Sequence, residues 1–253
     1  MIHPAAYSFD LDAAAYERGR PDYPSSAIKA IARELRITAK STVVDLAAGT
    51  GKFTRLLIPT GAHLIAVEPM RGMREELRKW ASDIKILAGI AESIPLARAS
   101  ADTITVAQAF HWFRIEEAIA EIYRVLRPDG GLALLWNRRD LGQPLQQAIH
   151  EIVIPYRGIE PEHDSDNWRE GFDRTNLFTS LQERHFPHSQ NVNTAGLIDR
   201  VISFSYIATL PESDKDVVRA RLRSLTRSMP ERFGLRYITT VFCCHVRNAA
   251  FPR

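Results

Sequence analysis

Short apolar runs alternate with longer amphipathic stretches from Ser41 onward. A short, partly β-branched apolar run is typical of a strand buried on both faces, and an amphipathic stretch between two such runs is typical of a crossover helix. The predicted strands are Val43–Leu46, Leu64–Val67, Ile84–Leu87, Thr103–Ala107 and Leu132–Trp136. The predicted helices between them are Lys52–Ile58, Arg71–Ala81 and Ile115–Leu126, with a turn at Arg127–Gly131. This alternation predicts an α/β fold built on a mostly parallel sheet.

The pattern is weaker after Asn137. Pro155–Asn176 is rich in proline, glycine and charge, as expected of a cap over a site. Further predicted elements are helices at Gln143–Ile154, Thr194–Ile202 and Glu212–Met229 and strands at Leu181–Pro187 and Arg236–Val246. We expect a Rossmann-like, seven-stranded sheet with helices on both faces. The expected parts are an N-terminal segment (1–40), a core (41–140), a cap region (141–180) and a C-terminal part completing the sheet (181–253).

Composition narrows the class of protein. A chain of 253 residues with 45% hydrophobic and 25% charged residues is typical of one globular domain. Its net charge of +3 is dispersed, so nucleic acid is not indicated as a partner. The two cysteines, Cys243 and Cys244, are adjacent, which argues against a disulfide framework or a structural metal site. Without a signal segment or an apolar run of about 20 residues, we expect a cytoplasmic protein that does not enter a membrane.

The segment Val43–Lys52 carries the main chemical signal: a strand, a glycine turn and the start of a helix. Glycines let a ligand approach the backbone closely, and a helix start offers unpaired amide donors. A phosphate loop is disfavoured because Leu46 and Phe53 occupy its first-glycine and hydroxyl positions. A dinucleotide fingerprint is disfavoured because Thr54 stands at its third glycine, although NAD is not excluded.

Two acidic residues flank this turn. Asp45 ends the first strand, Gly49 and Gly51 follow, and Glu68 closes the next strand about twenty residues further on. A carboxylate at the end of the second strand can accept hydrogen bonds from both hydroxyls of a ribose. The spacing therefore predicts a nucleoside-binding site.

Taken together, several ordered segments resemble class I S-adenosylmethionine (SAM)-dependent methyltransferases of the type 11 branch, including proteins similar to trans-aconitate methyltransferases. The resemblance covers nearly the whole chain. The segments are Tyr16–Pro24, Asp45–Gly51, Val67–Pro69, Ala91–Pro95, Ala107–Phe113 and Leu126–Gly131. It implies SAM as the donor, S-adenosylhomocysteine as the product, and no metal.

The resemblance also implies roles for single residues. Glu68, followed by Pro69, corresponds to the ribose acceptor, the Ala91–Glu92 turn to the adenine contact, and Gln108 to the methionine contact. Tyr16 and Arg20 correspond to a segment that folds over the donor near its carboxylate. One position departs from the family, because Ala47 replaces the first glycine. Alanine suits a negative φ and would be strained at a positive one.

The acceptor side is expected at the ends of the fourth and fifth strands. His111 is a candidate general base, and a plain helix-start residue is the alternative. Trp112, Phe113 and Trp136 are candidate pocket walls, or core packing. Asn137 and Arg138 also reach this rim, where Arg138 and Arg139 would favour an acidic acceptor unless they pair with Asp140.

Methyl transfer from a sulfonium is an in-line displacement that mainly requires alignment. We expect a small-molecule acceptor, methylated at a carboxylate or hydroxyl oxygen. The alternatives are an RNA or protein methyltransferase, a SAM-binding protein without catalysis, and an NAD-dependent oxidoreductase.

Overall fold

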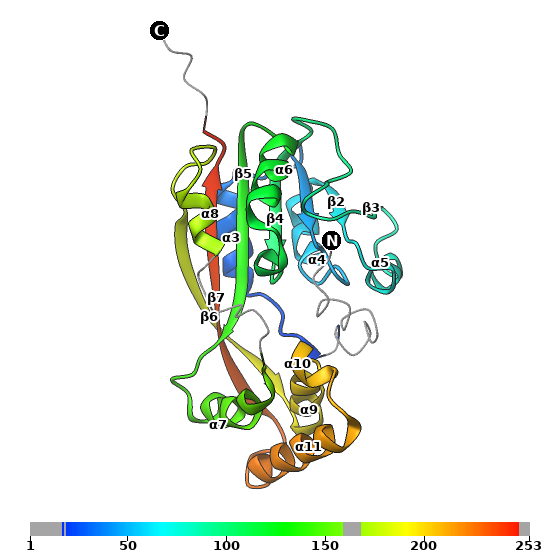
Figure 1. Ribbon diagram of the computed structural model, residues 1–253, viewed down its shortest axis with the longest axis vertical. Coiled ribbons are helices and arrows are strands. Elements are labelled where there is room, and N and C mark those ends of the chain that lie inside the picture. Colours follow the sequence, from blue (N-terminus) through cyan, green and yellow to red (C-terminus); the bar gives the residue numbers. More distant parts are fainter. Residues whose placement is uncertain (1–16, 18, 159–167, 248–253) are drawn as a thin grey trace.

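The computed structural model describes residues 17, 19–158 and 168–247 (Figure 1). A seven-stranded sheet with the order β3-β2-β1-β4-β5-β7-β6 forms its centre. The first five strands run parallel, whereas β7 pairs antiparallel with both β5 and β6. The strands are β1 (Thr42–Leu46), β2 (His63–Val67), β3 (Lys85–Leu87), β4 (Ala101–Ala107), β5 (Leu126–Arg139), β6 (Gln182–Val192) and β7 (Phe233–His245).

Helices cover both faces of the sheet. One face carries α3 (Ser25–Glu34), α4 (Thr54–Leu57) and α5 (Arg71–Arg78); the other carries α6 (Ile115–Val125) and α8 (Arg169–Asp173). The central strands are buried on both faces, which explains why they are continuous apolar runs in the sequence. The predicted α/β architecture, with its mostly parallel seven-stranded sheet and two helical layers, is confirmed.

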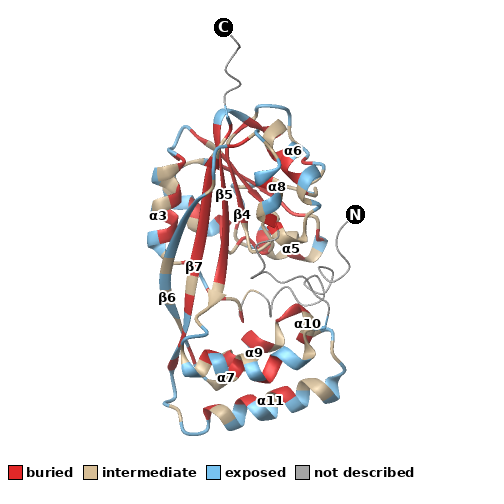
Figure 2. Cartoon of the chain, turned by 60° about the vertical axis from the view of Figure 1, so that its left-hand side comes forward, coloured by how far each residue is buried: buried red, intermediate tan, exposed pale blue. Residues whose placement is uncertain are grey.

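A second, helical lobe lies beyond one end of the sheet, and the long strands β5, β6 and β7 extend to it (Figures 1 and 2). Its helices are α7 (Pro144–Val153), α9 (Thr194–Ile202), α10 (Ser205–Ala208) and α11 (Glu212–Thr226). They share a core of their own, which includes Ile149, Val201 and Leu222. The lobe therefore combines helices from two separate stretches of the chain.

This arrangement differs from the division expected from the sequence. Helix α3 lies within the expected covering segment 1–40, yet Ala27, Ile28 and Ile31 pack on the sheet. Within the expected cap 141–180, α7 joins the lobe while α8 packs on the sheet through Phe172. Of the expected C-terminal part, only β6 and β7 complete the sheet, and α9–α11 build the lobe.

Single elements also differ in their bounds. The helix predicted at Lys52–Ile58 is only α4, followed by the 3-10 helix η2 (Ile58–Thr60), because Pro59 lacks the amide hydrogen that an α-helix requires. Strand β5 begins at Leu126, within the expected helix, and runs through the predicted turn. Leu126 pairs with Ala101 and Gly131 with Thr103, so the residues between them form an irregularity in the strand. Two further 3-10 helices are η3 (Phe110–Trp112) and η4 (Ile154–Tyr156).

Candidate functional site

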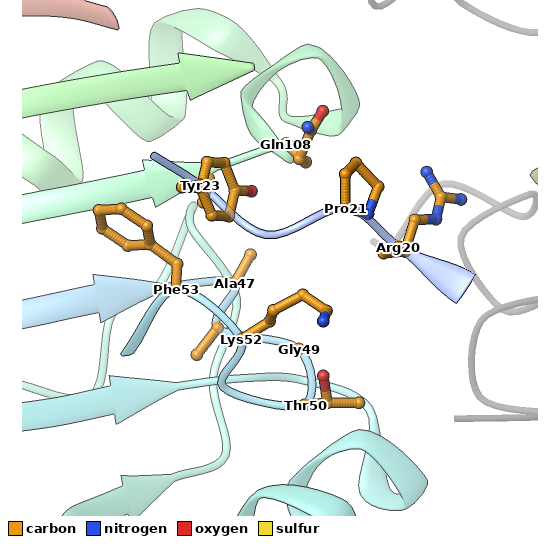
Figure 3. A pocket seen from close by; sticks show the side chains of 11 residues that line it. Arg20, Pro21, Tyr23, Ala47, Gly49, Thr50, Lys52, Phe53 and Gln108 are labelled. Atoms are coloured by element: carbon orange, nitrogen blue, oxygen red, sulfur yellow. The ribbon is translucent and has the colours of Figure 1, made fainter. Parts of the chain in front are cut away.

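A pocket opens at the carboxyl ends of β1 and β4, where α/β sheets bind their ligands (Figure 3). Four residues predicted for the donor site line it together: Arg20, Ala47, Gly49 and Gln108. The segment from Arg20 to Tyr23 lies between Gln108 and the loop after β1 in Figure 3. The lining also includes residues that the sequence did not single out: Pro21, Tyr23, Ala48, Thr50, Lys52, Phe53 and Ala107.

The loop after β1 alternates between ordinary and left-handed backbone. Ala47, Gly49 and Gly51 have φ values of 56°, 59° and 80°. Ala47 therefore adopts the conformation in which alanine is strained, at a cost of about 1 kcal/mol. Gln108 is also left-handed, with φ of 60°. Two strained residues thus line the same pocket, and such strain is concentrated at functional sites.

The two glycines of the loop have different functions. A Cβ on Gly49 would meet no protein atom within 4 Å, so this glycine leaves open space in the pocket. A Cβ on Gly51 would lie 2.4 Å from Cζ2 of Trp80 and 2.9 Å from Cγ of Leu77. Gly51 therefore permits the packing of α5 against the loop, whereas Gly49 permits the approach of a ligand.

Glu68 holds the loop after β1 in place through a hydrogen bond to its backbone. Its side chain is almost fully buried, and its two oxygens accept hydrogen bonds from the backbone N–H groups of Gly49 and Met70, each at 2.8 Å. A carboxylate has about four acceptor positions, so its capacity exceeds these two hydrogen bonds; the predicted contact with a ribose stays a prediction. The neighbouring Pro69 carbonyl accepts a bond of 2.6 Å from Nη1 of Arg74.

Asp45 does not line the pocket. Its carboxylate is buried and accepts hydrogen bonds from the hydroxyls of Thr54, at 2.5 Å, and Thr105, at 2.9 Å. Burial raises the pKa of Asp45 from its usual 3.8 to about 6, although the two threonine hydroxyls act in the opposite direction. Asp45 thus links β1 to β4 and to α4. It affects the pocket indirectly, by positioning the loop after β1.

The Ala91–Glu92 turn follows β3. Ala91 is buried in the core of the sheet, and Oε1 of Glu92 accepts a 2.9 Å hydrogen bond from the backbone N–H of Arg114, at the start of α6. Neither residue is among those that line the pocket. Their predicted contact with the adenine stays a prediction.

Glu17 and Asp22 are joined to the loop after β1 and to β5 by three polar contacts that the sequence did not indicate. Glu17 accepts a 2.5 Å hydrogen bond from the hydroxyl of Thr50, and Lys52 pairs with Asp22 at 2.8 Å. Nδ2 of Asn137 donates to the carbonyl of Asp22 at 3.2 Å. Asn137, predicted on the acceptor rim, thus connects β5 to the covering segment. Tyr16 lies outside the described residues.

On the predicted acceptor rim, Trp136 contacts His111. Trp136 is fully buried, stacks on Trp168 with ring centres 4.9 Å apart, and donates from Nε1 to Nδ1 of His111 at 3.2 Å. Because an indole N–H can only donate, Nδ1 is the acceptor and the neutral imidazole carries its proton on Nε2. A neutral His111 in this arrangement has its protonated nitrogen at Nε2, and the general-base role expected from the sequence stays a prediction.

The other predicted rim residues are partly exposed. Trp112 lies against His111, with ring centres 4.8 Å apart, and Phe113 packs edge-on against Phe110 at 5.4 Å. Phe113 also contacts the core of the sheet, which favours the packing alternative for it. Arg138 lies near the end of β5 and pairs in register with Ile238 of β7.

Known methyltransferases resemble this chain along most of its length. A family model described as a methyltransferase domain, of type 11, matches residues 44–134. A methyltransferase-like protein of Schizosaccharomyces pombe, itself uncharacterised, is 39% identical over 224 residues, covering 88% of this chain and 87% of the relative. A malonyl-[acyl-carrier protein] O-methyltransferase of Methylococcus capsulatus is 43% identical over 203 residues, covering 77% of this chain and 67% of the relative.

The fold is shared with solved structures. Phosphoethanolamine N-methyltransferase 2 of Haemonchus contortus, solved with S-adenosylhomocysteine and phosphomonomethylethanolamine, superposes with a TM-score of 0.58 at 13% identity. The match covers 94% of this chain and 58% of that one. Within the described residues, no helix combines the length and apolar character needed to cross a membrane. The same residues contain no cluster of three or more His, Cys, Asp or Glu side chains able to hold a metal ion.

Proposed function

This chain belongs to the class I SAM-dependent methyltransferases, and on that premise we propose that it methylates a carboxylate oxygen of a small-molecule acceptor. The observation that carries the proposal is the Trp136–His111 hydrogen bond, which leaves the proton of the neutral imidazole on Nε2. A hydrogen-bond donor at the acceptor rim suits an acceptor oxygen that is already anionic. An alcohol or amine acceptor would instead call for a group that removes a proton.

The pocket suits the donor. The open space in front of Gly49 is the kind of cradle that a Cβ would fill, and the carboxylate of Glu68 lies directly behind that glycine. We assign the methionine part to Arg20, Ala47 and Gln108, and the ribose to Glu68. Asp45 and Gly51 position the loop, and Pro69 with the Ala91–Glu92 turn forms the adenine side. When bound, SAM would supply a methyl group on a positively charged sulfur; a carboxylate oxygen of the acceptor would form the new O–C bond as the C–S bond breaks, giving an ester and a neutral thioether.

The name of one relative agrees with an oxygen acceptor. The relative from Methylococcus capsulatus is named as a malonyl-[acyl-carrier protein] O-methyltransferase, which supports an oxygen acceptor for this chain. A displacement by a carboxylate requires no proton transfer, because a small carboxylic acid is ionised well below pH 7. The protein then has only to hold the two reactants in line and to exclude water.

The test uses SAM labelled in its methyl group and a panel of small carboxylic acids, phenols, amines and RNA. Carboxyl methyl esters release labelled methanol in mild alkali, whereas aryl ethers and methylated amines do not. We expect alkali-labile label and a rate that is flat from about pH 6 to 9, because the acceptor is ionised throughout. Label that is stable to alkali, or label on RNA, would contradict the proposal.

The contribution of His111 is tested in the same assay. His111→Ala should lower kcat/KM by about tenfold or more through the lost hydrogen bond to the acceptor, with S-adenosylhomocysteine affinity unchanged. His111→Gln, which keeps an N–H donor, should retain more activity than His111→Ala. If a base were needed instead, both variants would lose activity equally.

A further inference from the structure

Two arginines flank one aromatic ring in the helical lobe. Arg139 ends β5, Arg200 belongs to α9, and Phe204 and Tyr206 lie at the turn into α10. The guanidinium carbons of Arg200 and Arg139 lie 4.7 and 5.5 Å from the centre of the Phe204 ring, and the Tyr206 ring lies 5.7 Å from it. We call these four residues the arginine cluster.

Arg200 is buried to an unusual degree for its charge. Only 6% of its surface is exposed, and its Nε donates to the hydroxyl of Tyr237 at 3.2 Å. Its Nη1 atom is buried without a hydrogen-bond partner, and no ion pair joins Arg200 to an acid among the residues that the structure describes. A buried donor of this kind destabilises a protein unless a ligand supplies an acceptor.

The surroundings of Tyr206 are strongly positive. Burial raises the pKa of its hydroxyl, and four guanidinium groups act against this effect: those of Arg139, Arg157, Arg200 and Arg20. Four positive charges therefore act on one half-buried phenol in the lobe. Such a concentration of charge attracts an anion more strongly than isolated surface arginines do.

The arginine cluster adjoins the donor pocket. Arg20 lines that pocket, and its Nη2 donates to the carbonyl of Ser203, directly before Phe204, at 2.9 Å. The backbone of Gly19 packs directly on α9, because a Cβ there would lie 3.0 Å from the carbonyl oxygen of Asp199. Residues 19 and 20 thus connect the donor pocket to the segment that carries Arg200 and Phe204.

We infer that the acceptor carries two acidic groups, of which one is methylated at the donor pocket and the other is held by Arg200, Arg139 and Tyr206. The planar fork of a guanidinium binds a carboxylate through two parallel hydrogen bonds, and a phenol adds a third donor. The second group explains why a charged side chain with an unsatisfied N–H is buried beside the site. The inference rests on the proposed function, since it gives the proposed carboxylate acceptor a second charge.

The experiment compares acids that differ only in the second charge. Malonate, succinate and glutarate are titrated by calorimetry into the protein saturated with S-adenosylhomocysteine, beside propionate, butyrate and the monomethyl ester of succinate. We expect at least one diacid to bind about tenfold or more tightly than its monoacid partner. The same acids are then offered as acceptors with labelled SAM.

Three variants locate the effect. Arg200→Met keeps the packing on Phe204 and should abolish the preference for diacids, while Tyr206→Phe removes one hydroxyl and should reduce that preference. Arg223→Met, on the exposed surface of α11, is the matched control and should leave the preference unchanged. S-adenosylhomocysteine affinity and circular dichroism report whether each variant is folded. If Arg200→Met does not fold, Arg200→Lys, which keeps the charge but loses the fork, should still weaken diacid binding.

The outcomes separate the two proposals. Equal binding of monoacids and diacids, or a diacid preference that survives both Arg200→Met and Tyr206→Phe, would overturn the inference. If monoacids are methylated at oxygen as efficiently as diacids, the proposed function stands and the inference of a second acidic group is wrong. If diacids bind through Arg200 but yield only alkali-stable products or none, the binding site stands and carboxylate methylation does not.

Discussion

Replacing Glu68 by Gln tests the donor site and its support at once. In the folded protein the Glu68 carboxylate accepts two backbone N–H groups, from Gly49 and Met70, in a site with 4% exposure. A glutamine amide presents only one oxygen, so one buried N–H would face the NH₂ group and lose its partner. The loss of a charge-assisted bond and an unsatisfied N–H together destabilise the protein by about 2 to 4 kcal/mol.

Two measurements separate folding from binding. Urea unfolding should report the decrease in the free energy of unfolding, and a thermal scan should show a drop in Tm of about 5 to 15 °C. Calorimetry with S-adenosylhomocysteine, below the transition, should show affinity weakened by about tenfold or more through the lost ribose contacts.

The matched control is Glu75→Gln on the same stretch of chain. Glu75 is exposed and, among the residues that the structure describes, forms its ion pair with Arg71 across one turn of α5, so its replacement should change neither measurement. An unfolding free energy for Glu68→Gln equal to that of the control would refute the support of the loop. Unchanged affinity in a folded Glu68→Gln variant would refute the donor assignment.

Further predictions concern the loop after β1 and the buried Asp45 that precedes it. Ala47→Gly should raise the free energy of unfolding by about 0.5 to 1 kcal/mol in a thermal scan, because glycine accepts a φ of 56° without strain; a loss of stability would show that the left-handed conformation is not costly. Gly51→Ala should destabilise the protein more than Gly49→Ala, because only the former meets Trp80, whereas Gly49→Ala should weaken donor binding more; calorimetry and urea unfolding of the pair decide this. Burial raises the pKa of Asp45 from 3.8 to about 6, so the folded protein binds its proton more tightly than the unfolded chain does. This proton contributes stability that is present below about pH 4 and is lost as the pH rises to about 6. The stability of wild type relative to Asp45→Asn should therefore fall by about 3 kcal/mol between pH 4 and pH 7 in urea unfolding; a pH-independent difference would contradict the burial argument.

Local patterns in the sequence were sufficient for the sheet and for the glycine loop. The strands at Val43–Leu46 and Leu64–Val67 lie within β1 and β2, because a strand buried on both faces must be apolar throughout. Helix α9 has the bounds that were predicted for it, Thr194–Ile202. The position of the donor pocket also follows from sequence, since the carboxyl ends of parallel strands meet at one edge.

Contacts between distant parts of the chain decided the rest of the site. Arg20 reaches Ser203, Asn137 reaches Asp22, and no local pattern contains such pairings. The early start of β5 depends on the pairing of Leu126 with Ala101, which outweighs the turn-like residues that follow it.

The sequence by itself therefore determined the fold class and the place of the pocket at the carboxyl ends of β1 and β4, because these depend on periodicity along the chain. Only the tertiary structure determined that Ala47 is strained, that Gly51 serves packing, and that His111 accepts a hydrogen bond from Trp136. It also brought Arg139 and Arg200 within 5.5 Å of the centre of one ring. Loop dihedrals, hydrogen-bond direction and clustered charge depend on which distant groups become neighbours, and that is settled only when the chain packs.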